Sequence, residues 1–564
     1  MLQKKYRIAC ALILFNGFAS QAQLTIQSGA NFVMEAGVQV TVQGNVTNAG
    51  TIINDGTLKV QSNYINSGTY GGTGTVGVLE LYGSGNSDVN AGSSSVANLV
   101  INKTVLTDIV KLAASLTVTN TLTLTNGVLT TDPIANPAFF LISPASATYA
   151  FAPGKEIVGS VKRTNWSGGS SRIFNATNMQ VITNGGTAPT DVTVTMIPLS
   201  AGGDPTQVER EVKRKFIFNQ TGGSGFTADV RYPYLPTELN TNVEANIVPW
   251  TLTASEWNAK MSPVTRDLAA DYVSTTGISA AQLAQEWKLA DPIYSMNAKA
   301  FIKGSWNNPT GVMRTTLNSN AILPLTQPYT IAPFSYPGSE SVASIPNANV
   351  VDWVLVEIRK PGTGLAADAT PPTAIGRKAG FLLSNGNIVD LDGVTPVQLT
   401  ITKQGSSNFI VVRHRNHLAA MSLSKASNAT GDFSNDFSSL ANVYQKPGAT
   451  SIPVSLLSAS APGNTQYGMW PGDVNNSGSI TPSDITPINS AIGGPSSGNL
   501  SVYNVRDANL DRNVTPSDVS VVNSSISAFA QTSSGRLATQ NRPAIRTTDT
   551  TPVSHVPGET RIAQ

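Results

Sequence analysis

The chain has 564 residues, of which 40 % are hydrophobic and 12 % charged, and its formal net charge is +2. This length is too great for a single hydrophobic core and predicts about three to five domains. The nearly neutral balance argues against nucleic acid and anionic membrane surfaces as partners, because both select strongly basic chains.

The N-terminus has the pattern of an export signal. Lys4, Lys5 and Arg7 form a positive region, an apolar core of signal-peptide length follows, and small residues precede a cleavage site after Ala22. We therefore expect residues 1–22 to be a signal peptide and the mature protein to be extracellular or on the outer cell surface. No other stretch is apolar over enough residues to predict a transmembrane span.

Cys10 is the only cysteine, and it lies inside this signal. The mature chain is therefore expected to have no disulfide and no thiol chemistry, although it is exported. Removal of the signal changes the formal charge from +2 to about −1. Stability would then come from extended sheet and bound ions.

A repeated turn marks the region from about residue 23 to 135, which is rich in Gly, Thr, Asn and Val. Its glycines are spaced by multiples of six residues, and short alternating strands lie between the turns. Such a period predicts a β-solenoid, in which each turn of chain buries its inward residues against its neighbours, and a Gly-rich sandwich is the alternative. The copies of the turn are Asn48-Ala-Gly50-Thr51, Asn54-Asp-Gly56-Thr57 and Asn66-Ser-Gly68-Thr69.

One stretch of this region, Gly72-Thr-Gly74-Thr-Val-Gly77, matches the dinucleotide-binding fingerprint. That fingerprint functions between a strand and a helix whose N-terminus faces the pyrophosphate. Here the strand-like residues 78–82 follow instead, so we expect no nucleotide site.

Short strand candidates separated by Gly, Pro and Asn turns predict a β-sandwich over residues 136–292. Trp250, Trp257 and Trp287 could form an aromatic platform for a sugar, but tryptophans of this kind more often fill a core, which is the interpretation we favour. The strand candidates are residues 158–163, 192–196, 215–218 and 226–232.

Residues 293–465 are expected to form a second β-sandwich-like module. Residues 350–359 have the pattern of a strand, and residues 382–391 that of a hairpin turning at Asn385-Gly386. Several stretches resemble the region just ahead of the dockerin-like end in large exported surface proteins of Bacteroidetes, which are repetitive, β-rich and without assigned catalysis. These stretches are residues 323–329, 351–359, 389–393 and 411–418.

His414 and His417 are two of the three histidines and lie in this module. A pair with this spacing could begin a zinc site, but no third ligand is identifiable, and residues three apart on one strand face opposite sides of a sheet. We therefore interpret them as structural histidines, flanked by arginines, that contact the neighbouring module.

A duplicated segment near the C-terminus is the strongest functional pattern. Two twelve-residue loops, 473–484 and 507–518, carry oxygen-bearing side chains at positions 1, 3, 5 and 12 and can offer a backbone carbonyl at position 7, which is the donor array of a calcium loop. Position 6 needs a left-handed backbone, which Gly478 supplies and Arg512 supplies only with strain. The expected Ca²⁺ ligands are Asp473, Asn475, Ser477, Ser479 and Asp484 in the first loop, and Asp507, Asn509, Asp511, Asn513 and Asp518 in the second.

The same residues also fit an ordinary helix start. Each loop ends in Thr-Pro-Ser-Asp, with Thr as the N-cap, Pro at the first helical position and Asp three residues past the cap. Both interpretations can hold together, because each loop is followed by an apolar stripe at helical spacing. The stripes are Ile485, Ile488 and Ile492 after the first loop, and Val519, Val522 and Ile526 after the second.

From Trp470 to Phe529 this arrangement resembles a type I dockerin, the module that docks secreted bacterial proteins onto cohesin partners. The sequence departs from the family at Ser477, where Asp is usual, and at Arg512, where Gly is usual. The resemblance implies that loop positions 10 and 11 contact the partner, and here these are Pro482-Ser483 and Pro516-Ser517, in place of the usual small hydroxyl pair.

Together these patterns predict a mainly β, non-catalytic, exported structural or adhesive protein that attaches to a cohesin-like or other surface protein through a calcium-binding pair of helices. A carbohydrate-binding adhesin is the first alternative, and an accessory glycoside hydrolase of polysaccharide degradation is the second. The expected order is a signal peptide (1–22), a solenoid (23–135), a sandwich (136–292), a second β module (293–465), a dockerin-like domain (466–530) and a disordered tail (531–564).

Overall fold

The computed structural model describes residues 22–198, 211–254, 256–405, 407–427, 431–447, 452–459, 465–494 and 502–528. Residues 1–21, with Cys10, and the expected tail lie outside this part of the chain. The fold is mainly β, with 46 % strand and 10 % helix, which confirms the predicted class. No helix among these residues combines the length and the apolar character that crossing a membrane requires. The chain forms two compact units, and the boundary between them lies between Asp291 and Pro292.

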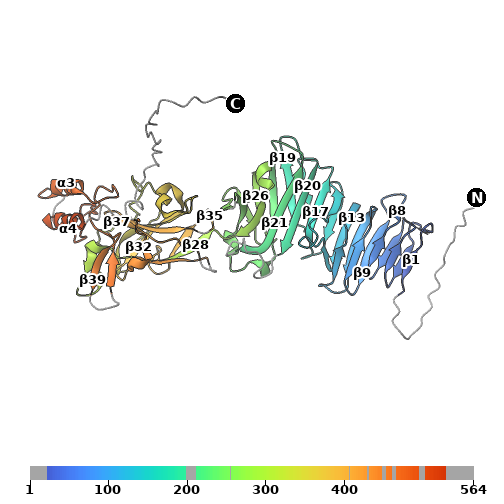
Figure 1. The fold of residues 1–564 in the computed structure, drawn as a ribbon, viewed down its shortest axis with the longest axis horizontal. Helices are drawn as coiled ribbons and strands as arrows, with labels where there is room; N and C mark the ends of the chain where they lie inside the picture. The colour runs from blue at the N-terminus through green and yellow to red at the C-terminus, as the bar shows by residue number, and fades with distance from the viewer. Residues whose placement is uncertain are drawn as a thin grey trace, which may run out of the picture. The chain divides into compact units, whose positions relative to one another are not determined.

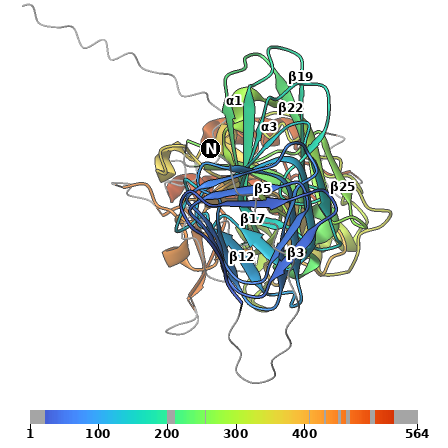
Figure 2. The ribbon, with the colours of Figure 1, turned by 90° about the vertical axis from the view of Figure 1, so that its right-hand side faces the viewer.

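The first unit begins with a β-solenoid of about seven turns, as predicted from the repeated glycines. Short strands on successive turns pair in parallel, so Val46 is in register with Leu24 on one side and with Tyr64 on the other. Figure 1 shows these strands side by side, and Figure 2 looks along the stack, with β3, β5 and β12 on different sides of it. One side contains β1 (Leu24–Ile26), β4 (Val46–Asn48), β7 (Tyr64–Asn66), β10 (Ser87–Asn90), β12 (Ile109–Leu112) and β14 (Val128–Thr130), the second contains β2 (Asn31–Met34), β5 (Thr51–Asn54) and β8 (Thr69–Gly71), and the third contains β3 (Gln39–Val42), β6 (Thr57–Val60), β9 (Val78–Gly83), β11 (Ser95–Lys103) and β13 (Leu116–Asn126).

The repeated Asn-x-Gly turns lie at corners of the solenoid, and their asparagines are buried. Asn48 Nδ2 donates to Asn66 Oδ1, 18 residues later on the next turn, at 2.6 Å. In two copies of the turn the asparagine Oδ1 accepts the N–H of the glycine two residues on, at 3.0 Å for both Asn48–Gly50 and Asn54–Gly56. The six-residue step is therefore one side of the solenoid, and three sides complete a turn.

The glycines of the fingerprint-like stretch allow the turns to stack closely. A Cβ on Gly77 would lie 1.9 Å from the carbonyl oxygen of Asn54 on the preceding turn, whereas a Cβ on Gly74 would meet nothing within 4 Å. Strand β9 follows directly, as predicted, so no helix N-terminus faces these glycines.

Gly77→Ala should therefore destabilise the solenoid, because the methyl group cannot be placed without separating two turns. We expect a loss of about 3 kcal/mol, measured by thermal unfolding of the intact chain followed by circular dichroism. Gly74→Ala is the matched control in the same loop and should change stability by less than about 0.5 kcal/mol. Equal melting temperatures for the two variants would contradict this account of the packing.

Parallel pairing continues beyond residue 135, the expected end of the solenoid. Strand β13 pairs in parallel with β15 (Leu141–Pro144) and β16 (Thr148–Phe151), and β15 pairs in parallel with β17 (Ile157–Thr164). The direction changes at the other edge of β17, which pairs antiparallel with β20 (Asp191–Pro198). Strand β17 thus belongs both to the solenoid and to the antiparallel part that follows.

Two antiparallel sheets pack face to face in the rest of the first unit. Phe216 and Phe218 of one sheet make edge contacts with Tyr232 of the other, with ring centroids 5.3 and 5.9 Å apart. Trp250, Trp257 and Trp287 are buried, which confirms their interpretation as core residues. The first sheet runs from β17 through β20, β21 (Glu211–Thr221), β27 (Glu286–Ala290), β23 (Val248–Thr253) and β24 (Glu256–Ala259), and the second contains β18 (Arg172–Ile173), β19 (Gln180–Asn184), β22 (Thr227–Pro233), β26 (Tyr272–Ser279) and β25 (Val264–Asp267), with helix α1 (Ala280–Leu283) after β26.

An eight-stranded sheet forms the body of the second unit. Its central strand β31 (Val350–Arg359) has the predicted bounds and is buried along its whole length. The predicted hairpin is also present, because β32 and β33 pair antiparallel and Gly386 between them has φ +91°. The order is β34 (Val397–Thr400), β28 (Ile293–Lys299), β33 (Asn387–Val389), β32 (Ala374–Leu383), β31, β36 (Phe409–His414) and β37 (His417–Met421), with β38 (Phe433–Asp436) paired to the other edge of β28.

The second unit also contains two helices near its C-terminal end and several short elements. The helices α3 (Pro482–Ala491) and α4 (Pro516–Ser527) contain the two predicted apolar stripes, except that Ile492 is the C-cap residue just after α3. These stripes pack into one cluster with Leu418 of β37 and Trp470. The other strands and α-helix described in this unit are β29 (Trp306–Asn307), β30 (Val312–Met313), α2 (Thr316–Ser319), β35 (Lys403–Gln404), β39 (Ser455–Ala459) and β40 (Thr465–Gly468), and its short 3-10 helices are η3 (Lys303–Ser305), η4 (Ala366–Asp368), η5 (Pro371–Thr373) and η6 (Leu440–Asn442).

Candidate calcium-binding loops

Both helices begin as the sequence predicts. Thr481 and Thr515 are extended N-cap residues, a proline follows at the first helical position, and Asp484 and Asp518 complete a capping box in each helix. Asp484 Oδ2 accepts the N–H of Thr481 and Asp518 Oδ2 that of Thr515, both at 2.9 Å. The last residue of each twelve-residue loop is therefore also the capping carboxylate of the helix behind it.

The two loops have the same backbone course, although their sequences differ. Position 4 is left-handed in both, with φ 55° at Asn476 and at Leu510. Position 6 is also left-handed in both, with φ 79° at Gly478 and 78° at Arg512. Arg512 thus adopts the conformation expected of glycine, at a cost of about 1 kcal/mol. The sharp turn is a property of both loops and does not depend on a glycine.

In the first loop, the two aspartates point their oxygens at the backbone that surrounds them. Asp473 accepts the N–H groups of Ser477 at 2.8 Å and Gly478 at 3.0 Å. Asp484 Oδ1 accepts the N–H of Asn475 at 3.1 Å from the far end of the loop. The loop is therefore folded back on itself, with positions 1 and 12 both bound to its interior.

The second loop repeats this pattern atom for atom. Asp507 accepts the N–H groups of Asp511 at 3.1 Å and Arg512 at 2.9 Å. Asp518 Oδ1 accepts the N–H of Asn509 at 3.2 Å. Asn509 Oδ1 also accepts the N–H of Asp511 at 2.9 Å, as Asn475 Oδ1 accepts that of Ser477 in the first loop.

The carboxylates at positions 1 and 12 of both loops are buried, and burial disfavours their ionised form. Burial, followed by the charge of Asp484, raises the pKa of Asp473 to about 7. Burial also raises the pKa of Asp507 to about 7, with Asp518 adding to the rise and Arg415 opposing it. The pKa values of Asp484 and Asp518 are raised as well, chiefly by burial. Each loop thus holds two carboxylates whose ionised form would be stabilised by a cation.

The side-chain oxygens of each loop are ligands of the kind that calcium prefers. Buried carboxylates stand at positions 1 and 12, and an amide oxygen stands at position 3, all of which are hard ligands. Ser477 donates to the carbonyl oxygen of Ser479 at 2.9 Å, so positions 5 and 7 lie together in the first loop. In the second loop, Asn513 N–H and Nδ2 donate to Asp511 Oδ1 at 2.9 and 3.2 Å. Within the described ranges, no group of three or more His, Cys, Asp or Glu side chains is placed to hold a metal ion.

The residues that the dockerin resemblance assigns to a partner lie on the surface at the start of each helix. Pro482, Ser483, Pro516 and Ser517 are all exposed. The two serines are also tied to their loops, because the position-3 asparagine donates to each Ser Oγ at 3.0 Å. Each serine Oγ also bonds the Oγ1 of the loop threonine two residues before it, at 2.6 Å for Ser483 and 2.7 Å for Ser517, so loop geometry and the exposed helix starts are coupled in each repeat.

The structure corrects the expectation that His414 and His417 face opposite sides of a sheet. They belong to two strands, since β36 ends at His414 and β37 begins at His417, and they are paired across the tight turn between them. Their rings contact each other at a centroid distance of 4.8 Å. The spacing rule for a single strand fails here because the chain reverses between the two residues.

One assignment of protons satisfies every nitrogen of the pair. His414 Nε2 donates to Asp352 Oδ2 at 3.1 Å. The N–H at His417 Nδ1 is shared between Asn416 Oδ1 at 2.8 Å and His414 Nδ1 at 3.0 Å. His417 Nε2 accepts the N–H of Gly304 at 3.2 Å. Burial lowers the pKa of both rings, which favours these neutral forms. No ring nitrogen is left to bind a metal, which supports the structural interpretation.

Asp352 is the centre of a buried network that the sequence analysis did not identify. Besides His414, its carboxylate accepts Arg415 Nε at 3.1 Å, Tyr503 Oη at 2.5 Å and the N–H of Trp353 at 2.8 Å. Burial disfavours its ionised form, but Arg415 and His414 outweigh that penalty and hold its pKa below the ordinary value. The network joins the central strand β31 to the residues that lead into the second loop.

The turn between β36 and β37 also binds the second loop directly. Asn416 Nδ2 donates to the carbonyl oxygens of Val505 at 3.0 Å and Asp507 at 2.8 Å. Arg314 Nη2 reaches the carbonyl oxygen of Asn509 at 3.2 Å. The predicted contact between the histidine segment and the C-terminal helix pair is therefore present. An Arg-His-Arg-Asn-His run is the only sequence signal that could have indicated it.

Comparison with known proteins gives no relative from which a function could be transferred. No protein-family model, no curated protein and no solved structure matches the chain.

Proposed function

We propose that the chain is an exported structural or adhesive protein of the cell surface, whose C-terminal helix pair binds two calcium ions and attaches the protein to a cohesin-like or other surface protein. Asp473, Asn475, Asp484, Asp507 and Asn509 would hold the ions, together with the remaining oxygens of positions 5, 7 and 12. The ions would neutralise the buried carboxylates. The solenoid and the β sheets would serve as the body that is attached, with no catalytic step.

One observation carries the proposal: two loops of different sequence have matching left-handed positions and matching carboxylate hydrogen bonds. A pair of ordinary helix caps would require Thr and Asp at the helix start but would not require buried aspartates at positions 1. Four buried carboxylates in two small loops are costly unless a cation offsets them. The type I dockerin resemblance supports the same assignment.

Calorimetric titration of the intact chain with CaCl₂ tests the proposal. We expect two binding events in the natural chain and their loss in Asp484→Ala/Asp518→Ala, with the first unit still folded. Asp88→Ala, which removes an exposed solenoid carboxylate, is the matched control and should leave both events unchanged. Undiminished binding in the double variant would refute the assignment.

Attachment is tested separately from calcium binding. A calcium-dependent pull-down from the organism's own envelope should recover a partner with the natural chain. Pro482→Arg/Pro516→Arg should lose that partner while retaining both calcium events, because these side chains are exposed at the helix starts and, unlike Ser483 and Ser517, are not bonded to the position-3 asparagines. Retention of the partner by this variant would place attachment elsewhere on the protein.

A further inference from the structure

The turn between β36 and β37 contacts both candidate calcium loops through one residue. Asn416 is buried, and its carbonyl oxygen accepts the N–H of Gly472 at 2.9 Å. Gly472 directly precedes Asp473, which is position 1 of the first loop. The side chain of Asn416 donates to the carbonyl oxygen of Asp507, which is position 1 of the second loop, at 2.8 Å. A single residue is therefore bonded at the start of each loop.

The side-chain amide of Asn416 is fixed in one orientation. Its Nδ2 donates to the carbonyl oxygens of Val505 at 3.0 Å and Asp507 at 2.8 Å, and its Oδ1 accepts from His417 Nδ1 at 2.8 Å. Because these bonds are made inside the protein, rotation of the amide would leave buried polar atoms without partners, which is unfavourable. The start of the second loop is thus held in one position relative to the turn.

The residues that lead into the first loop are held from two sides. Leu418 of β37 donates its N–H to the carbonyl oxygen of Trp470 at 2.8 Å, and His417 forms an antiparallel bridge with Pro471. Ser525 of α4 donates its hydroxyl to the carbonyl oxygen of Pro471 at 2.8 Å. The entry to the first loop is therefore bonded both to the β36–β37 hairpin and to the helix that follows the second loop.

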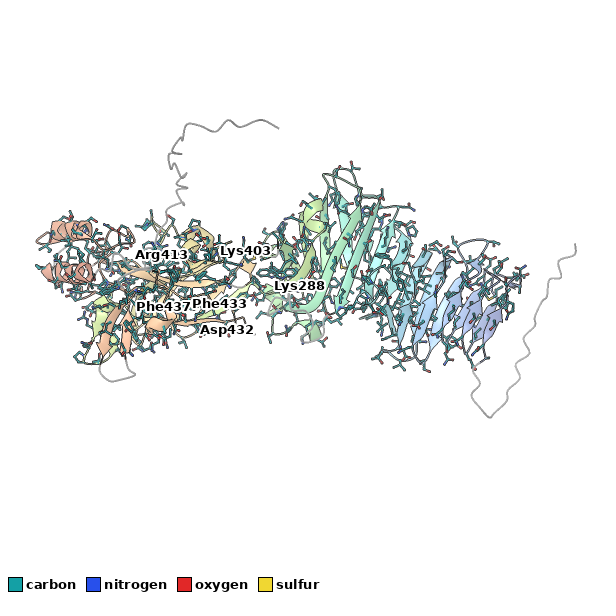
Figure 3. The ribbon with its side chains drawn as sticks, in the orientation of Figure 1. Lys288, Lys403, Arg413, Asp432, Phe433 and Phe437 are labelled. Atoms are coloured by element: carbon teal, nitrogen blue, oxygen red, sulfur yellow. The ribbon has the colours of Figure 1, made fainter. Side chains whose placement is uncertain are left out.

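Strand β36 also lies beside the first loop through Arg413, which Figure 3 labels. Arg413 and Asp473 line one small cavity, together with His414 and His417. On its other side, Arg413 Nη1 donates to Glu357 of the central strand β31 at 3.2 Å. The hairpin thus adjoins position 1 of the first loop through a charged side chain as well as through its backbone.

These contacts give a physical route by which one loop can influence the other. A cation bound in either loop would fix the start of that loop, because the position-1 aspartate is among its ligands. Asn416 would then be held in the orientation that the other loop also requires. The conformational entropy lost when the first ion binds is not lost again when the second ion binds, and this produces positive cooperativity.

We propose that Asn416 is a positioning residue shared by both calcium loops, and that it couples them so that an ion in one loop raises the affinity of the other. This inference rests on the proposed calcium binding and adds a relation between the two sites. Coupling between two sites of one protein is commonly about fivefold or more.

Calorimetric titration of the intact chain with CaCl₂ measures the coupling. Asp484→Ala disables the first loop and Asp518→Ala the second, so each variant gives the affinity of the remaining loop alone. In the natural chain, the product of the two affinities should exceed the product of these separate values by at least about fivefold. When Asn416→Ala is added to all three chains, this excess should fall below about twofold.

Arg314→Ala is the matched control, because Arg314 donates to the carbonyl oxygen of Asn509 at 3.2 Å and, among the described residues, makes no hydrogen bond to the first loop. It should weaken the second loop and leave the excess unchanged. Asn416→Asp keeps the volume of the side chain but removes its donors, and it should lower the excess in the same way if Asn416→Ala does not fold.

The outcomes separate this inference from the calcium assignment itself. Two ions that bind independently in the natural chain would overturn the coupling and leave the proposed calcium binding intact. An excess that is unchanged by the substitutions of Asn416 would also overturn the inference alone. Absence of any calcium binding by the natural chain would overturn both proposals.

Discussion

Removing calcium should lower the melting temperature of the C-terminal helix pair more than any other change of solution conditions. A ligand that binds only the folded state stabilises it by about 4 kcal/mol when its concentration is a thousand times its dissociation constant. The loops would supply that difference, because their four terminal carboxylates are buried and a bound cation would neutralise them. Differential scanning calorimetry of the intact chain in millimolar Ca²⁺ and in chelator measures it.

The effect of calcium should depend on pH in a defined direction. In the calcium-free fold, Asp473 and Asp507 have pKa values of about 7, above the ordinary 3.8. Their protonation therefore stabilises that fold fully below about pH 4, and this stabilisation is lost as the pH rises through about 7. The calcium-free protein should melt at a higher temperature at pH 5 than at pH 8.

The calcium-bound protein should show the opposite trend, since protons compete with the cation for the same oxygens. The difference between the melting temperature in Ca²⁺ and that in chelator should be largest above pH 7 and should become smaller toward pH 5. The solenoid provides the internal control, because its unfolding should be the same in calcium and in chelator. A helix pair that melts at one temperature in both solutions at pH 8 would disprove the calcium assignment.

The sequence predicts those parts of the fold that depend on local repetition. The Asn-x-Gly turns, which recur at multiples of six residues, indicate stacked turns of chain, and in the structure Asn48 and Asn54 each accept the N–H of the glycine two residues later. Strand β31 is predicted to the residue, since seven of its ten residues are apolar and the other three are the charged residues Asp352, Glu357 and Arg359. The helix starts at Thr481 and Thr515 follow from capping chemistry that spans only four residues.

Local sequence patterns do not predict features that depend on residues far apart in the chain. Asp352 is separated from Arg415 by 63 residues and from Tyr503 by 151, so no local pattern connects them. The histidine pair was placed on one strand because the turn at Arg415-Asn416 contains neither glycine nor proline.

Asp352→Asn should be among the most destabilising single substitutions in the second unit. The side chain keeps its size but loses the charge that offsets Arg415, and one of its two polar atoms becomes a donor facing other donors. Loss of one partner of a buried ion pair costs about 3–5 kcal/mol. For a unit of this size the melting temperature should fall by on the order of 10 °C. Calorimetry of the intact chain would show this shift in the second unit alone.

Asp368→Asn is the matched control, because Asp368 is exposed in the same unit and its carboxylate accepts only the hydroxyl of Thr363. It should change stability by less than about 0.5 kcal/mol. A double-mutant cycle with Arg415→Gln isolates the ion pair, and we expect a coupling of about 1–3 kcal/mol. Additive effects of the two substitutions would show that Asp352 acts through packing and not through its charge.

The same variant should also weaken one of the two calcium-binding events. Tyr503 and Arg415 both hold the segment that enters the second loop, and Asn416 binds the carbonyl oxygen of Asp507 at 2.8 Å. Loss of their common partner should loosen position 1 of that loop. The first loop should be unaffected, because among the described residues it makes no hydrogen bond to Asp352 or Arg415. Calorimetric titration of Asp352→Asn with CaCl₂ should therefore show one unchanged event and one weakened about tenfold or more. Two unchanged events would mean that the network stabilises the sheet without positioning the loop.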